Sequence, residues 1–139
     1  MDEALLAAYL ATDYRIRLPA GGCASLRIGA PMPDALRQLT GDAAWGVITA
    51  WNPRSQPMPK AWNRRAQRAL LADLRQREDI AGIHAAVGVG VDGWREPSLL
   101  VIGPDAASLR SLCARLHQHA FVAGEGGTPP RLCWTGDIP

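Results

Sequence analysis

The side chains best suited to chemistry in this chain follow an apolar run at residues 45–51. Asn52, Arg54 and Ser55 come directly after it, with a proline between them. An amide and a hydroxyl can orient a ligand through hydrogen bonds, and a guanidinium can bind an anion through two parallel bonds. We interpret residues 48–55 as a ligand-facing loop. A turn in which Asn, Pro and Ser stabilise the backbone explains the same residues equally well.

Three further polar positions need a partner or a function. Asn63 lies, at about 100° per residue, on the same face of a predicted helix as Leu70 and Leu74, so it either contacts a ligand or braces the preceding loop. Glu96 and Ser98 are two residues apart in a predicted strand and point to one face. A carboxylate buried there is costly unless it is paired or hydrated. Glu96 is therefore our candidate catalytic acid or base, although we slightly favour a structural carboxylate paired with Arg64, Arg65 or Arg95.

The elements that must position these residues follow from hydrophobic periodicity. The order predicted for the central part of the chain is strand, helix, strand, strand, helix, strand, over residues 45–51, 60–77, 83–91, 96–102, 105–117 and 120–123. This is the order of an α+β, ferredoxin-like βαββαβ two-layer sandwich. In such a sheet the first and third strands are antiparallel neighbours, so the end of 45–51 should lie beside the start of 96–102.

This topology brings the unexplained polar residues to one edge of the sheet. The first helix should begin there, the second strand should end there, and the second helix should return there. We therefore predict a cleft at the carboxyl end of strand 45–51. Its expected ligand-binding residues are Asn52, Ser55, Asn63, Arg64, Trp94, Ser98 and Gln118, with Glu96 as the catalytic candidate.

The rest of the chain is expected to extend this core within a single domain, residues 1–139. The predicted parts are an N-terminal helix and hairpin extension (1–44), the βαββαβ core (45–123) and a C-terminal part (124–139). Within them we expect a helix at 2–12, a β-hairpin of 14–18 and 24–28, a short helix in 31–40 and a candidate added strand at 131–134. The Gly and Pro content of 124–130 favours a mobile loop that could close the cleft.

Composition and charge exclude several classes of function. Of the 139 residues, 47% are hydrophobic and 20% charged, which is enough apolar material for a core. A net charge of +2 is too small to indicate nucleic-acid or membrane binding. No basic segment precedes the apolar residues 5–10, and these are too few to span a membrane. We therefore expect a cytoplasmic protein without a membrane partner.

Signals for cofactors and metals are weak. The three cysteines are widely spaced, which favours reduced thiols. Gly88-Val89-Gly90 lacks the further glycine of a dinucleotide-binding loop. His117 and His119 have no evident third metal ligand. We therefore expect neither a cofactor nor a metal.

Four short motifs, in order, resemble a known bacterial family. They are Asn52-Pro53-x-Ser55, the later Asn63, Glu96-x-Ser98 and Gln118-x-Ala120. Together they resemble the family catalogued as domain of unknown function 3293, over nearly the whole chain. Relatives often carry an acidic residue before the second Asn, where this chain has Trp62. The resemblance implies no particular activity.

Three functions fit these observations. The first is binding of a small polar or anionic ligand in the cleft, with Arg54, Arg64 and Arg65 near a helix start to receive a negative group. The second is an enzyme that uses Glu96 as general acid or base in the same cleft. The third is a nucleic-acid or protein interaction module through the basic region 54–77, which the low aromatic content disfavours. We prefer the first, and expect a monomer or weak homodimer.

Overall fold

The computed structural model describes residues 2–136, which form helices around one sheet. The helices are α1 (Glu3–Leu10), α2 (Asp34–Thr40), the 3-10 helix η1 (Pro53–Ser55), α3 (Lys60–Arg75) and α4 (Ala106–Arg115). The strands are β1 (Asp13–Arg17), β2 (Cys23–Leu26), β3 (Ala44–Ile48), β4 (Gly82–Val89), β5 (Arg95–Ile102), β6 (Ala120–Glu125) and β7 (Arg131–Trp134). Within this part of the chain, every helix is too short or too polar to cross a membrane.

The seven strands join one antiparallel sheet in the order β2-β1-β4-β5-β3-β6-β7. β3 pairs with β5, with Val47 opposite Leu100, which is the neighbour relation expected for the first and third core strands. The N-terminal hairpin adds β1 to the edge of β4, and β7 adds to β6. The predicted α+β class is confirmed, and both predicted additions belong to the same sheet.

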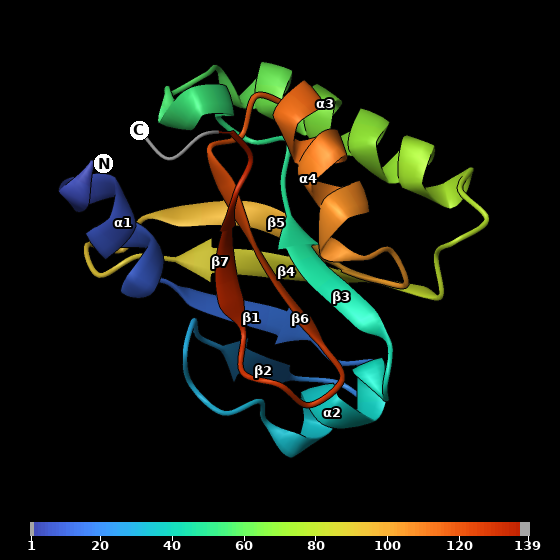
Figure 1. Cartoon of the computed structure of the whole chain (residues 1–139). Coiled ribbons are helices and arrows are strands. Elements are labelled where there is room, and N and C mark those ends of the chain that lie inside the picture. Colours follow the sequence, from blue (N-terminus) through green and yellow to red (C-terminus); the bar gives the residue numbers. More distant parts are fainter. Residues whose placement is uncertain (1, 137–139) are drawn as a thin grey trace.

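The sheet is curled and is covered differently on its two faces (Figure 1). α3 and α4 pack on one face, over a buried cluster that includes Leu70 and Val101. The other face encloses a second cluster, which includes Leu100 and, from α2, Leu36. Leu100 and Val101 are neighbours in β5 and belong to different clusters, because successive strand residues point to opposite faces. Both faces therefore bury apolar surface, which is the main stabilising contribution to such a fold.

α1 lies at one end of the sheet and is held there by few side chains. The ring of Tyr9 meets the ring of Trp134 in β7 edge to face, with centroids 6.1 Å apart and an interplanar angle of 86°. The Oγ1 of Thr12, just after the helix, donates to the carbonyl of Ala8 at 2.6 Å. No residue of α1 is fully buried. The helix therefore covers part of the sheet with one side and faces water with the other.

β3 ends earlier than predicted, at Ile48 instead of residue 51. The N–H of Ala50 donates to Oε1 of Gln67 in α3 at 2.9 Å, so this backbone group bonds to a side chain and not to a neighbouring strand. The Oγ1 of Thr49 donates to the carbonyl of Pro97 at 2.8 Å. These side-chain bonds end the ladder and direct the chain into the loop before α3.

The segment 124–130 lies at the opposite end of β3 from that loop. The carbonyl of Gly126 accepts a hydrogen bond from Nε1 of Trp45 at 3.3 Å, and its N–H donates to the carbonyl of Ala43 at 2.8 Å. Trp45 also lies against Gly124, where a Cβ would come within 2.6 Å of the indole. These contacts fix the segment beside the start of β3.

Candidate functional site

The loop that follows β3 has an unusual backbone conformation. Asn52, Arg54 and Ser55 have φ angles of 47°, 55° and 57°, in the left-handed region that residues other than glycine seldom adopt. Asn tolerates this region, whereas Arg and Ser each pay roughly 1 kcal/mol. Strain of this kind persists only where the surrounding structure fixes it, and it concentrates at binding sites. The loop therefore needs bracing from the rest of the fold.

Asn63, in the first turn of α3, provides much of this bracing. Its side chain is only 1% exposed. Its Oδ1 accepts from the N–H of Asn52 at 2.9 Å, and its Nδ2 donates to Oδ1 of Asn52 at 2.7 Å and to the carbonyl of Met58 at 3.3 Å. The N–H of Met58 donates to the same Asn52 oxygen at 3.0 Å. These bonds match the bracing interpretation of Asn63.

Gln118 and His117, which follow α4, hold the loop from another direction. The Nε2 of Gln118 donates to the carbonyl of Trp51 at 3.1 Å. The N–H of Arg54 donates to the carbonyl of His117 at 2.7 Å. Since the amide nitrogen of Gln118 is engaged, its Oε1 is the atom left to accept a bond from a ligand.

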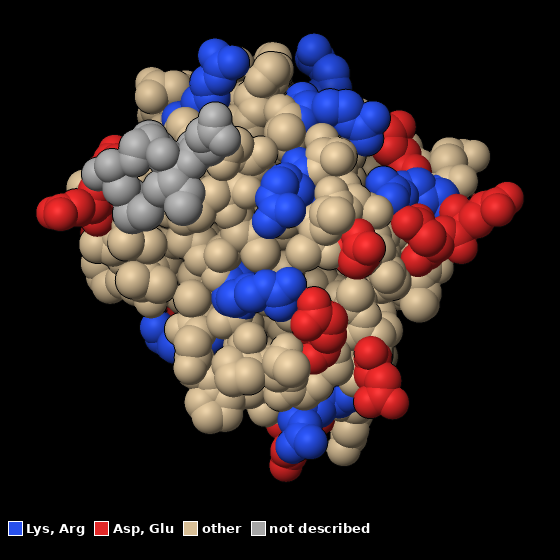
Figure 2. Space-filling view, in the orientation of Figure 1, with Lys and Arg blue, Asp and Glu red and all other residues tan. Residues whose placement is uncertain are grey.

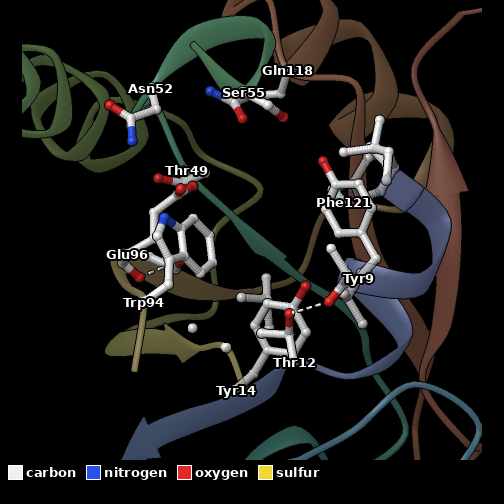
Figure 3. A pocket seen from close by; sticks show the side chains of 18 of the residues that line it. Tyr9, Thr12, Tyr14, Thr49, Asn52, Ser55, Trp94, Glu96, Gln118 and Phe121 are labelled. Atoms are coloured by element: carbon white, nitrogen blue, oxygen red, sulfur yellow. Dashed lines mark hydrogen bonds between the residues drawn. The ribbon is translucent and has the colours of Figure 1, made fainter. Parts of the chain in front are cut away.

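A cavity of about 360 Å³ lies beside this loop. Ser98 lines it and shares a strand face with Leu100, so the cavity lies on the sheet face opposite α3 and α4. α1 contributes Leu5 and Tyr9 to the wall. Figure 3 shows side chains arranged around this space: Asn52, Ser55 and Gln118 on one side, Trp94, Glu96 and Thr49 on another, and Tyr9, Thr12 and Tyr14 below.

Glu96 contributes a partly buried carboxyl to the cavity wall. Burial raises the pKa of its carboxyl to about 8, from a usual value of 4.5. Among the described residues, no side chain or backbone group forms a hydrogen bond or ion pair with this carboxyl. The arginine pairing considered from the sequence is therefore absent from this part of the chain. Near neutral pH, the protonated form of the Glu96 carboxyl therefore predominates.

Two tyrosine hydroxyls share this environment. Burial, and to a smaller extent the charges of Glu96 and Cys113, raises the pKa of Tyr9 to about 12, with partial offset from Ser55 and the Ala120 backbone. Burial also raises the pKa of Tyr14. Both hydroxyls are therefore neutral at physiological pH and can donate or accept hydrogen bonds.

The structure brings together most of the site residues predicted from the sequence. The predicted residues that line the cavity are Asn52, Ser55, Trp94, Glu96, Ser98 and Gln118. Asn63 does not line it and lies beneath the loop instead. Arg64 is exposed and also lies outside the lining, because it is on the water-facing side of α3. Segment 124–130 does not contribute to the wall either.

Sequence reasoning missed the contribution of the N-terminal part of the chain. Tyr9, Thr12 and Tyr14 line the cavity, as does Phe121 of β6. The sequence assigned the N-terminal helix to packing, with the second face of the sheet as one surface that it could cover, and did not show that it closes a cavity. The one available signal was the residue type, since a Tyr combines an apolar ring with a polar hydroxyl that seeks a partner.

Cysteine and histidine side chains do not form a metal site in the described part of the chain. Within residues 2–136 no three His, Cys, Asp or Glu side chains are grouped closely enough to hold an ion. Cys23 is exposed, whereas Cys113 and Cys133 are buried, and all three are free thiols. Burial raises the pKa of Cys113 to about 12, so this thiol is a poor nucleophile.

These features define a small α+β protein with a ligand-sized cavity between a curled antiparallel sheet and its N-terminal helix. A family model described as "Protein of unknown function (DUF3293)" matches residues 48–121, just over half of the chain. The chain belongs to this family, and the resemblance seen in the sequence motifs is confirmed. Comparison with curated proteins finds no match, and neither does comparison with solved structures. Tyr9 and Tyr14 lie outside the matched segment, so part of the cavity wall does too.

Proposed function

We propose that the protein binds a small molecule in the cavity beside the 49–55 loop. The observation that carries this proposal is a cavity of about 360 Å³ whose wall combines polar and apolar parts. Its volume is in the range of ligand sites. Three hydrogen-bonding groups are not engaged by described residues: the Asn52 amide nitrogen and Gln118 Oε1 on the loop side of the cavity, and the Glu96 carboxyl beside Trp94 (Figure 3). Apolar groups such as Val47 and Phe121 complete the wall. This arrangement suits a molecule with a polar end and an apolar body.

The chemistry of the wall argues against the anionic ligand considered from the sequence. Among the described lining residues there is no Lys, Arg or His, and the acids Asp92 and Glu96 are present. An anion would raise the pKa of Glu96 further, and no cationic side chain among the described lining residues would offset its charge. A neutral polar or a positively charged ligand is therefore the form we propose.

A thermal-shift screen against a metabolite library tests the proposal. Wild type is compared with a Trp94→Ala, Glu96→Gln double variant. Both changes should preserve the fold, because Trp94 is 46% exposed and a Gln side chain has nearly the shape of the protonated Glu96 carboxyl. The matched control is Trp62→Ala, Glu78→Gln, which makes the same changes at exposed positions outside the cavity.

A true ligand raises the melting temperature of wild type and of the control, but not of the cavity variant. At a concentration of about 100 times the dissociation constant, the added stability is about 2.7 kcal/mol. Ligands that stabilise all three proteins equally would place binding elsewhere. If no compound stabilises wild type, the cavity is a packing defect and the proposal fails.

A second candidate, catalysis in the same cavity, is favoured by the unpaired Glu96 carboxyl. A group whose pKa is about 8 exchanges its proton readily near neutral pH, as a general acid or base must. The test is product analysis of each screen hit after incubation with wild type and with Glu96→Gln. Turnover by wild type that the variant loses, while it still binds, would support catalysis. If the compound is unchanged in both samples, the protein binds it without catalysing a reaction.

The interaction module stays a prediction with less support. Arg64, Arg65 and Arg68 of α3 are exposed. On the face shown in Figure 2, however, basic groups are scattered among acidic and uncharged ones and do not form one continuous patch. Nucleic-acid binding usually requires such a patch.

The proposal also covers the fold type, the cellular location and the oligomeric state. We interpret β3-α3-β4-β5-α4-β6 as a ferredoxin-like unit, supported by the neighbour order β4-β5-β3-β6, with β1, β2 and β7 as additions. We expect a bacterial cytoplasmic protein. Because both sheet faces are covered within one chain, we expect a monomer or weak homodimer, which light scattering would test.

A further inference from the structure

The charges and rings of the cavity wall have a pattern that the general proposal does not use. The ionisable side chains among the described lining residues are acids and phenols: Asp92 of the β4–β5 turn, Glu96 of β5, Tyr9 of α1 and Tyr14 of β1. The other elements of the wall, including β3, its loop and β6, contribute no charged side chain to it. Glu96 therefore has no described counter-ion in the space that it faces.

Aromatic rings enclose much of the same space. Tyr9, Tyr14 and Trp94 line the cavity together with Phe121. In Figure 3, the Trp94 indole lies beside Glu96, and the two tyrosines lie across from the polar loop residues. The face of an aromatic ring is electrically negative and attracts a cation within about 6 Å of its centre. Carboxylate and rings thus favour the same sign of charge in a ligand.

Trp94 is also exposed in a way that packing does not explain. It is 46% exposed at the cavity mouth. A Cβ on Gly90 would lie 3.4 Å from Cβ of Trp94 and 3.5 Å from its Cε3, so the indole rests against bare backbone there. The N–H of Trp94 donates to Oδ1 of Asp92 at 3.2 Å, which fixes the turn. A bound molecule would cover the free surface of this ring.

We propose that the ligand of this cavity is a small organic ammonium ion, a protonated amine or a quaternary ammonium, held between the Glu96 carboxylate and the rings of Tyr9, Tyr14 and Trp94. The inference rests on the proposed small-molecule function and names its ligand class. The ammonium supplies the counter-ion that Glu96 lacks. Its carbon substituents contact the apolar part of the wall, and hydroxyl or carbonyl groups on the ligand bond to Asn52 and Gln118.

This assignment predicts a pH dependence with a definite sign. Ammonium binding requires ionised Glu96, whose pKa of about 8 in the free protein means about 1% ionisation at pH 6 and about 90% at pH 9. Tyr9 and Tyr14 stay neutral over this range, because their pKa values are raised. Asp92, the other acid among the described lining residues, is exposed to water. Affinity for a permanent cation should therefore rise with pH, by on the order of 10- to 100-fold.

The experiment uses two matched pairs of probes and isothermal titration calorimetry. Choline is paired with 3,3-dimethylbutan-1-ol, which replaces the charged nitrogen by carbon, and benzylamine is paired with benzyl alcohol. Each probe is titrated at about pH 8 into wild type, Glu96→Gln and the control Glu78→Gln. Choline is then titrated into wild type from about pH 6 to about pH 9.

We expect at least one cation to bind wild type and Glu78→Gln about tenfold or more tightly than its uncharged partner. Glu96→Gln should abolish that preference while it leaves the affinity for the uncharged partner within about twofold. Choline affinity, where choline binds, should rise with pH in wild type and stay flat in Glu96→Gln.

The two proposals fail in different ways. Equal binding of cations and uncharged partners would overturn the ammonium assignment and leave the binding function in place. The absence of cation binding in both pairs, at millimolar concentration, would overturn the assignment too. The metabolite screen would then decide separately whether the cavity binds anything.

Discussion

Replacement of Asn63 by Ala is the sharpest test of how the site is held together. The substitution removes three hydrogen bonds: one to the N–H of Asn52, one to its Oδ1 and one to the carbonyl of Met58. Each buried bond contributes about 1 kcal/mol, so the loss is roughly 3 kcal/mol. Ala is the better helix former by up to about 0.7 kcal/mol. The free energy of unfolding should therefore fall by roughly 2 kcal/mol.

Urea denaturation measures this difference, with Arg64→Ala as the control. Arg64 is the next residue of the same helix and is exposed, so its variant should stay within about 0.5 kcal/mol of wild type. For a chain of this size the Asn63→Ala variant should melt roughly 8 °C lower. It should also lose affinity for cavity ligands, because residues 52–55 are free to leave the left-handed region.

A small effect would refute this reasoning. If Asn63→Ala unfolds within about 0.5 kcal/mol of wild type, water or an alternative loop conformation replaces the amide bonds without cost. If stability falls but ligand affinity is kept, the loop does not depend on Asn63 for its shape. The first result would refute the bracing interpretation of Asn63, and the second would refute the link between bracing and ligand binding.

Three further outcomes follow from the same structure. Because the folded-state pKa of Glu96 is raised from 4.5 to about 8, wild type should lose stability relative to Glu96→Gln as pH rises through this interval, with no further loss above it. Urea denaturation at a series of pH values measures this, and an equal pH dependence of the unfolding free energy in both proteins would show that the carboxyl is hydrated. Gly124→Ala should destabilise by roughly 1–3 kcal/mol in thermal unfolding, since its Cβ would meet the ring of Trp45, and an unchanged melting temperature would show that the ring can move. A thiol reagent should label exposed Cys23 in the native protein and buried Cys113 only after unfolding; rapid labelling of Cys113 would indicate local opening.

Several features of the fold could be predicted from local sequence because their causes are local. The N-terminal hairpin turns at Gly21 and Gly22, whose φ angles of 103° and 71° suit glycine. The Gly-Gly dipeptide in the sequence predicts this turn. α3 and α4 follow from apolar residues at helical spacing, and the side chain of Asp105 caps α4 by accepting from the N–H of Ser108. These signals depend on neighbours along the chain, so reading the chain in order was enough to find them.

The site was predictable only in part. Pairing of β3 with β5 and the return of α4 to the same edge follow from the strand order, so Asn52, Glu96 and Gln118 could be grouped in advance. The roles within the group could not be assigned. Asn63 bonds to the loop and Arg64 faces water, because the exact rotation of α3 over the sheet decides which side chains reach the cavity.

The sequence by itself determined the order of elements, the α+β class and the family motifs, because hydrophobic period and turn residues act over a few positions. Only the tertiary structure decided that Tyr9 and Tyr14 close the wall opposite the loop, since a periodic pattern shows that a face is apolar but not what covers it. It also decided the state of Glu96. The pKa of a carboxyl depends on every group that displaces water from it, and the wall around Glu96 is built from several elements, α1 and β1 among them, which are brought together only by folding.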